Sequence, residues 1–283
     1  MQRYKILHRT YYNFSGTVTL GPHILRLRPR EDHGLRIESS LLNITPTATL
    51  RWHRDVEDNS IAVASFNSPA KQLVIESEVI IQQYNLEPLD FLIADYALNY
   101  PFAYKPEDWA VLEPYVDVSV HDMNDAFSAW LESLWHSDEH LQTYGLLQRI
   151  TERIQQNFSY QRREESGVQS VSDTLSYGTG SCRDLANLFI VSARHLGFAS
   201  RFVSGYLHAE PSNVNFGSTH AWAEVFLPGA GWTGFDPTIG NIVGTDHIAV
   251  AVARSPELVP PVEGSFNGPT GADLDVGVWV TNL

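Results

Sequence analysis

The chain has 283 residues, of which 19 are Lys or Arg and 33 are Asp or Glu, so its formal net charge is −14. This charge argues against nucleic acid and against an anionic membrane surface as partners, because both are bound through basic patches. Hydrophobic residues make up 43% and charged residues 18%, a composition that predicts a folded protein of one large or two ordinary domains.

The cysteine content bears on the compartment. The single cysteine, Cys182, excludes an intrachain disulfide bond. The first residues lack the apolar segment of a signal peptide, and no apolar run approaches the ~20 residues that a membrane helix needs. We therefore expect a cytoplasmic protein.

Residues 1–90 are predicted to form a β-rich N-terminal domain. Apolar and polar residues alternate over residues 72–84, and residues 10–14 and 23–27 form further strand-like runs. Asp58 and Asn59 lie between two such runs and predict a hairpin turn. We expect a small antiparallel sandwich or barrel, and nothing in it suggests catalysis.

Residues 91–120 are predicted to connect this domain to a second one at 121–283. Prolines interrupt the connecting segment at positions 101, 106 and 114. Helical periodicity then predicts helices over residues 122–135 and 139–158. A polar stretch over residues 161–172 is expected to be an exposed loop.

A third helix is predicted to begin at the only cysteine. Ser181 is a plausible N-cap, because its hydroxyl can accept a hydrogen bond from an N–H of the first turn. Asp184 suits the positive end of the helix dipole, and Gly197 suits the position after the helix end. Cys182 is then the first helical residue, where the dipole favours a thiolate.

Strand-like runs follow the third helix and predict a sheet behind it. They lie at residues 200–207, 219–227 and 232–235, with a Pro-Gly-Ala-Gly turn between the last two, and further runs lie at 247–253 and 274–280. The predicted fold class is therefore α+β, with an antiparallel β domain at the N-terminus.

Cys182, His220 and Asp236 form the pattern that points to chemistry. His220 begins one strand of the predicted hairpin, and Asp236 ends the other. If Leu227 pairs with Gly231, Asp236 becomes the diagonal neighbour of His220 on the same face, within reach of an imidazole contact. A register shift by one residue would place the two on opposite faces.

These three residue types are those of a nucleophile, a general base and an orienting acid. His220 would take the proton of Cys182, and Asp236 would orient the imidazole. The backbone N–H of Cys182 is the expected oxyanion donor, with Tyr160 as a candidate second donor. Tyr160, Trp222 and Glu224 are candidates to line a substrate cleft, although aromatic residues beside a hairpin more often serve packing.

The flanking motifs resemble the transglutaminase-like core of the papain-like cysteine enzymes. They are GSCRDLA at 180–186, RHLGFASRFVSGY at 194–206, HAWAEV at 220–225 and GWTGFDPT at 231–238. The order Cys, His, Asp matches that family. The resemblance implies a papain-like core with the nucleophile at a helix start, and acyl transfer through a cysteine thioester.

The remainder of the chain resembles a bacterial group of transglutaminase-like proteins, usually described as cysteine proteases. The segments that carry this resemblance are YY at 11–12, LRLRPR at 25–30, DVEDN at 55–59, HIAVAVAR at 247–254 and PPVEG at 260–264. For this group the resemblance suggests association with ATP-grasp-type peptide ligases. Dense acidic loops of the kind that bind calcium in animal transglutaminases are not evident.

The hypothesis from the sequence is a cysteine-dependent peptidase or amidase without a cofactor. Amine transfer, a non-catalytic peptide-binding module and an arylamine-acetyltransferase-like activity remain as alternatives. His136 and His140 have helical spacing but no evident third ligand, so no metal site is predicted. A peptide or protein amide is the expected substrate, and the sequence does not indicate an oligomeric state.

Overall fold

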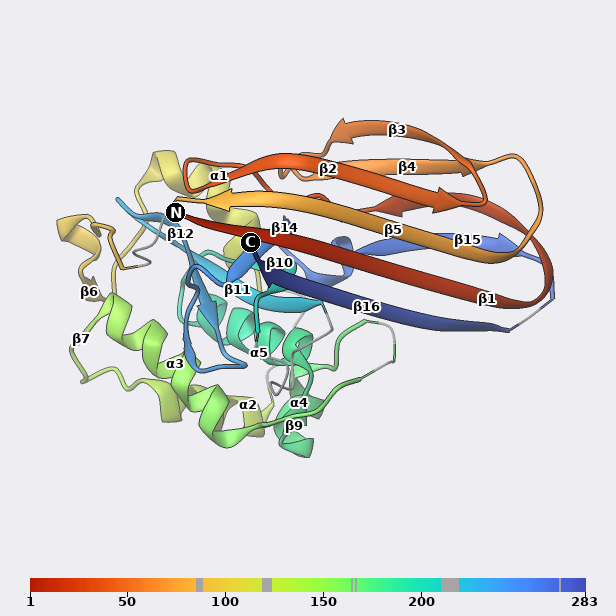
Figure 1. Cartoon of the computed structure of the whole chain (residues 1–283). Coiled ribbons are helices and arrows are strands. Elements are labelled where there is room, and N and C mark those ends of the chain that lie inside the picture. The colour runs from red at the N-terminus through yellow and green to blue at the C-terminus, as the bar shows by residue number, and fades with distance from the viewer. Residues whose placement is uncertain (85–88, 119–123, 164, 166, 210–218, 270) are drawn as a thin grey trace.

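We describe the protein from a computed structural model, which covers residues 1–84, 89–118, 124–163, 165, 167–209, 219–269 and 271–283. The chain forms a β-rich part and a helical part with its own sheet (Figure 1). This mixed architecture confirms the predicted α+β class.

Seven strands form the sheet of the β-rich part, in the order β2-β5-β1-β4-β3 with β15 and β16 added to β1. They are β1 (Gln2–Leu25), β2 (Leu35–Thr45), β3 (Ala48–Arg54), β4 (Ser60–Phe66), β5 (Ala70–Gln83), β15 (Val262–Asn267) and β16 (Ala272–Asn282). The predicted hairpin between two strand-like runs is present as β3 and β4, and Asp58 in its turn has a φ of 60°.

Strand β1 organises this part of the molecule. The two runs expected at residues 10–14 and 23–27 belong to this one strand of 24 residues. Its first half pairs with β5 on one side and β16 on the other, and its second half pairs with β4 and β15. Apolar side chains are buried between these strands, among them Phe14, Val18 and Leu73.

The end of the chain returns to its beginning. Strand β16 pairs with β1 from Tyr4 opposite Asn282 to Phe14 opposite Ala272, so the two termini lie side by side (Figure 1). Strands β15 and β16 fall within residues 121–283, the range expected for the second domain, yet they extend the N-terminal sheet. Pairing partners so distant in sequence leave no local pattern by which the sequence could reveal them.

The second part contains the helices and a five-stranded sheet of order β13-β12-β11-β10-β14. Its strands are β10 (Ser200–Leu207), β11 (His220–Leu227), β12 (Gly231–Asp236), β13 (Asn241–Ile242) and β14 (His247–Ala253). The short pairs are β6 (Asn99–Tyr100) with β7 (Leu141–Gln142), and β8 (Ser159–Tyr160) with β9 (Thr179–Gly180). Its helices are α1 (Pro106–Val116), α2 (Asp125–Leu134), α3 (Thr143–Asn157), α4 (Val171–Tyr177) and α5 (Cys182–His195).

Two of these helices differ from the sequence prediction. Helix α1 lies in the connecting segment, where prolines suggested irregular chain; Pro106 occupies its first turn, where a missing N–H costs nothing. Helix α4 begins inside the predicted loop of residues 161–172 and is too short to show periodicity. Residues 122–123 of the expected helix 122–135, and 119–120 of the connecting segment, lie outside the described residues.

Helix α5 is the centre of the second part. It packs on the face of β11 that carries Ala221, Ala223 and Val225, helices α3 and α4 also contact it, and Trp130 of α2 donates to its Ser192. Twelve of its fourteen residues are buried, so the helix is held on nearly all sides. This packing fixes the start of α5, where Cys182 lies.

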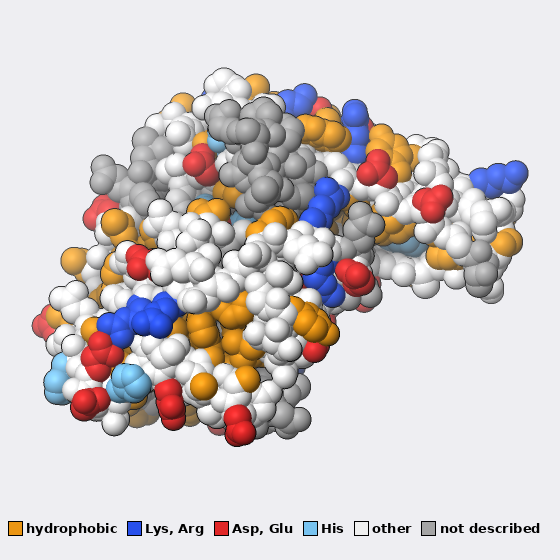
Figure 2. Space-filling view, turned by 90° about the horizontal axis from the view of Figure 1, so that it is seen from below, with side chains coloured by type: hydrophobic (Ala, Val, Ile, Leu, Met, Phe, Trp, Pro, Cys, Tyr) orange, Lys and Arg blue, Asp and Glu red, His pale blue; other side chains and the backbone are white. Residues whose placement is uncertain are grey.

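A second apolar layer joins the two parts. Tyr4 and Ile6 of β1 pack with Tyr206 of β10 and Ile248 of β14. The buried Asn59 adds a polar contact, since its side chain bonds both the N–H and the C=O of Val252, each at 2.8 Å. The helical face of the molecule shows acidic, basic and hydrophobic side chains interspersed (Figure 2).

Among the described residues, no helix is both long and apolar enough to cross a membrane.

Candidate active site

Cys182 is the first residue of α5, with Ser181 as its N-cap, as the sequence predicts. The cysteine is 8% exposed, and its backbone N–H belongs to the first turn, whose N–H groups have no acceptor within the helix. The thiol therefore lies where the helix dipole and free N–H groups favour negative charge.

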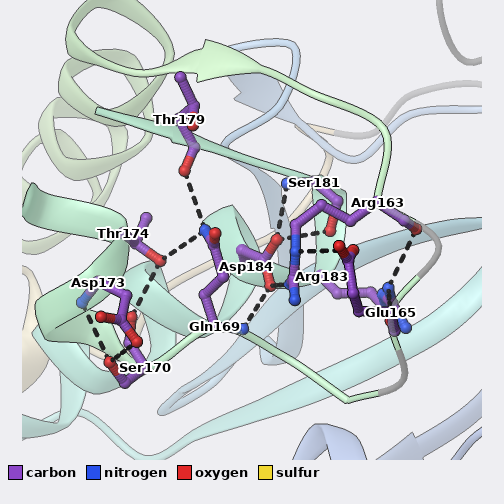
Figure 3. A network of polar contacts seen from close by, with 10 residues as sticks. All are labelled: Arg163, Glu165, Gln169, Ser170, Asp173, Thr174, Thr179, Ser181, Arg183 and Asp184. Carbon is purple, nitrogen blue, oxygen red and sulfur yellow. Dashed lines mark hydrogen bonds and ion pairs between the residues drawn. The ribbon is translucent and has the colours of Figure 1, made fainter. Parts of the chain in front are cut away.

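Asp184 locks this helix start. Its buried carboxylate accepts hydrogen bonds from the backbone N–H and the hydroxyl of Ser181, both at 2.8 Å. It also accepts from the guanidinium of Arg163 and from the N–H of Gln169, both at 2.7 Å (Figure 3). Burial opposes the charge of this carboxylate, but the hydrogen bonds outweigh burial and lower the pKa of Asp184.

The same network ties the segment before α4 to the site. The side chain of Gln169 donates to the carbonyl of Thr179 in β9, and the guanidinium of Arg183 donates to the carbonyl of Glu165 (Figure 3). Part of the loop that the sequence predicts to be exposed is therefore anchored, because its charged and amide groups bond to the start of α5.

His220 and Asp236 meet as the predicted register requires. Strands β11 and β12 pair Leu227 with Gly231 and Ala223 with Phe235, which confirms that register. The Nε2 atom of His220 lies 2.6 Å from Oδ2 of Asp236, and both side chains are almost fully buried. The other oxygen of Asp236 accepts from the N–H of Thr238 at 2.8 Å.

The electrostatics of this pair favour a proton on the imidazole. Burial alone would lower the pKa of His220, but the charge and hydrogen bond of Asp236, and the adjacent Cys182, raise it above its ordinary value. Burial would raise the pKa of Asp236, but His220 and His247 outweigh burial and lower it. The pair is therefore an imidazolium and a carboxylate in contact.

Cys182 lies beside the free nitrogen of His220. Nδ1 of His220 is buried without a hydrogen-bond partner among the described residues, and the thiol is close enough to contribute to the raised pKa of the imidazole. Contacts of this kind are often loose without substrate and tighten when it binds. The structure thus brings His220 and Asp236 into contact, and Cys182 is near enough to affect the pKa of His220.

Tyr160 lies at the same helix start. It ends β8, which pairs in parallel with Thr179 and Gly180 of β9 just before the nucleophile. Burial, followed by the nearby Cys182, raises the pKa of Tyr160 to about 12. Its hydroxyl is therefore protonated at neutral pH and can donate a hydrogen bond.

Trp222 and Glu224, the other candidates to line a substrate cleft, both make contacts within the protein. Trp222 is 1% exposed and packs in one cluster with Val203 and Val252. Glu224 forms an ion pair with Arg201 at 2.7 Å. Both residues alternate with those of β11 that pack on α5, so they belong to the other face of the sheet, where Arg201 also pairs with Glu57.

His247 joins the site and was not singled out by the sequence. Its Nε2 atom lies 3.0 Å from the same Oδ2 of Asp236 that bonds His220. The only feature that marks His247 in the sequence is its position at the start of the 247–253 strand-like run. No spacing in the sequence indicates that the start of β14 lies near the end of β12. Arg163 and Gln169 were missed for the same reason, since each acts through Asp184 at a distance along the chain.

His220, Asp236 and His247 are also close enough to hold a metal ion, with ligand atoms within 4.8 Å of one another. As found, however, two ring nitrogens converge on one carboxylate oxygen as hydrogen-bond donors. Metal binding would need those nitrogens free of protons. The hydrogen bonds of the protein account for the cluster without a metal.

Comparison with known families supports the resemblance predicted from the sequence. Residues 136–237 match the Transglutaminase-like superfamily, and residues 4–82 match the Bacterial transglutaminase-like N-terminal region. The segment that matches the transglutaminase-like superfamily contains Cys182, His220 and Asp236, and the segment that matches the N-terminal region precedes it. Strand β14, with His247, lies beyond the matched core.

Full-length relatives are known from mycobacteria. An uncharacterized protein of Mycobacterium tuberculosis H37Rv is 28% identical over 98% of this chain and 92% of its own length. An uncharacterized protein of Mycobacterium leprae is 23% identical over the full length of both chains. These relatives match the chain over nearly its whole length, and their names state no activity.

A solved structure shares the whole fold. It was described as "a Putative Cysteine Protease from Cytophaga hutchinsonii", and it matches with a TM-score of 0.76 over 100% of this chain and 91% of its own. The two sequences are 17% identical, so the match establishes the fold and not the activity.

Proposed function

We propose that the protein is a cysteine-dependent acyl-transfer enzyme that hydrolyses an amide bond of a peptide or protein. One observation carries this proposal: the only cysteine begins a helix beside His220, whose other nitrogen is 2.6 Å from a buried carboxylate. A nucleophile, a base and an orienting acid in this arrangement generate a thiolate–imidazolium pair. The match to a transglutaminase-like core supports the same chemistry.

In the first half of the reaction, the thiolate of Cys182 attacks the amide carbonyl and forms a carbon–sulfur bond. The backbone N–H of Cys182 and the hydroxyl of Tyr160 donate to the developing oxyanion. His220 gives its proton to the departing amine as the carbon–nitrogen bond breaks. A thioester on Cys182 remains, and the amine is the first product.

In the second half, water attacks the thioester, and His220 accepts a proton from it. The carbon–sulfur bond breaks, so a carboxylic acid leaves and the thiolate of Cys182 is restored beside the imidazolium of His220. An amine in place of water would give a new amide, as in a transglutaminase. We favour water because no described feature of the site provides a binding place for an amine. A free thiol nucleophile also supports a reducing compartment such as the cytoplasm.

The first test is the rate at which iodoacetamide alkylates Cys182 as a function of pH. With one cysteine in the chain, the signal has a single source. We expect fast alkylation well below pH 8, and on the order of 100-fold slower alkylation at pH 6 in H220A, because an ordinary thiol has a pKa near ~8.5. Equal profiles for the two proteins would contradict the proposal and favour a binding module.

The second test separates the role of Tyr160 from that of His220. Y160F should keep the alkylation profile but lose about 10²-fold in turnover of a peptide amide, the usual effect of removing an oxyanion donor. Y177F, at an exposed tyrosine of α4, is the matched control. Unaltered turnover in Y160F would remove Tyr160 from the mechanism. Mass analysis of products with and without added methylamine distinguishes hydrolysis from amine transfer.

A further inference from the structure

The carboxylate of Asp236 is shared between two histidines, and only one of them faces the nucleophile. Oδ2 accepts from Nε2 of His220 at 2.6 Å and from Nε2 of His247 at 3.0 Å. Both imidazoles are nearly inaccessible to solvent, and Asp236 is completely so. The proposed mechanism uses His220 and Asp236 but gives no task to His247.

The tautomer of His247 follows from the contact of its second ring nitrogen. Nδ1 of His247 lies 3.2 Å from the N–H of Gly244, which donates to it. Nδ1 must therefore carry a lone pair, and the hydrogen of the neutral ring lies on Nε2, directed at Asp236. His247 is a donor to the carboxylate in the one tautomer that this backbone contact allows.

Packing holds the ring of His247 in that direction. The indole of Trp222 meets it edge to face, with ring centroids 5.2 Å apart, and the ring of His220 lies 6.0 Å away. Its chain neighbour Asp246 accepts from the hydroxyl of Tyr4 at 3.0 Å and faces His208 at 3.3 Å. The ring is thus held from the sheet, from the turn at Gly244 and from the N-terminal part.

From this geometry we infer that His247 is a positioning residue, which acts on Cys182 only through Asp236 and His220. Its N–H anchors Oδ2 in the plane where His220 bonds it, so the carboxylate cannot rotate away from the imidazole. Without the donor from His247, the carboxylate of Asp236 would retain its bond to His220 but lose this restraint. The inference deepens the proposed function and rests on it.

The matched variants for a test are H247Q and H247F. The amide nitrogen of Gln reaches the place of Nε2 and keeps the donor, whereas Phe keeps the ring and removes the donor. We expect alkylation of Cys182 at pH 6 to fall about tenfold in H247F, as for a lost hydrogen bond to a charged group, and to stay within about twofold in H247Q. The lower limb of the pH profile should move upward in H247F only.

Folding is checked by urea unfolding of each variant. If H247F does not fold, H247N replaces it. The shorter amide of H247N does not reach Oδ2, so this variant should show the same slower alkylation as H247F. H220A serves as the reference: if it leaves alkylation unchanged, the proposed function fails. If H220A slows alkylation while the Phe or Asn variant matches the wild type, the role of His247 alone is overturned.

Discussion

At the scale of single residues, the buried pair of His220 and Asp236 couples the chemistry of the site to stability. The pKa of His220 is raised, so its contribution is complete below the unfolded value of ~6.5 and is lost as pH rises through the folded value. The pKa of Asp236 is lowered, so its contribution is complete above ~3.9 and is lost as pH falls through the folded value. Between these limits both contributions are present.

D236N should therefore be most costly between about pH 4 and pH 6.5, where we expect a loss of about 3–5 kcal/mol in the free energy of unfolding. The loss should shrink on either side of that window. Urea unfolding of wild type and variant across pH measures it. D138N makes the same chemical change at an exposed position and should alter stability by less than ~0.5 kcal/mol at every pH. A pH-independent loss in D236N would contradict the ion pair.

The residues of this site could be predicted from the sequence to different extents. Cys182, His220 and Asp236 lie at the ends of elements whose boundaries are marked locally, by an N-cap and by a hairpin turn. His247 could not be found in this way, because its contact with Asp236 depends on a sheet order that brings β14 beside β10. Trp222 and Glu224 share the face of His220 by alternation, but alternation does not show that Trp222 meets the ring of His247 or that Glu224 pairs with Arg201.

At the scale of elements, two helices begin with the same Ser-x-x-Asp pattern in different surroundings. In α5, Ser181 and Asp184 are buried, and Arg163 and Gln169 also bond the carboxylate. In α4, Ser170 and Asp173 are exposed, and Ser170 donates to Asp173 at 2.7 Å. The sequence predicted the first of these caps, but only the structure shows that the carboxylate of Asp184 anchors a distant segment as well.

The two caps allow a matched prediction. D184N should lower the free energy of unfolding by about 3 kcal/mol, because it removes the buried charge that Arg163 bonds and leaves that guanidinium only the exposed Glu165. D173N should cost about 1 kcal/mol or less, the usual value for an exposed cap. D184N should also slow alkylation of Cys182, since it loosens the turn that holds the thiol. Equal effects of the two substitutions would show that the network around Asp184 adds nothing to an ordinary cap.

At the scale of the whole molecule, the N-terminal part supports the strand that carries His247. Strand β14 continues from His247 into the apolar layer shared with β1, and its Val252 is bonded on both backbone groups by Asn59. Strands β15 and β16 then complete the N-terminal sheet. This arrangement could not be predicted from the sequence, because the strands at 1–90 and the final strands appeared as separate regions.

Strand β14 depends on Asn59 for two backbone hydrogen bonds, so N59A should weaken it. Removal of this side chain leaves the N–H and C=O of Val252 unpaired in the interior, and at ~1–3 kcal/mol for each orphaned group we expect a loss of about 3–4 kcal/mol. Because β14 also carries His247, alkylation of Cys182 should slow several-fold at temperatures where the variant is still folded. Urea unfolding and the alkylation rate at pH 6 measure the two effects on one sample.

The matched control for this prediction is N13A. Asn13 is exposed and accepts one hydrogen bond from Gln72 within the N-terminal sheet, so its loss should change stability by less than ~0.5 kcal/mol and leave alkylation unchanged. If N59A is destabilised yet alkylates at the wild-type rate, β14 does not transmit the state of the N-terminal part to Asp236. If both properties fall together, the N-terminal part helps to orient His220. A contact made more than 160 residues from His220 in sequence then governs the reactivity of Cys182.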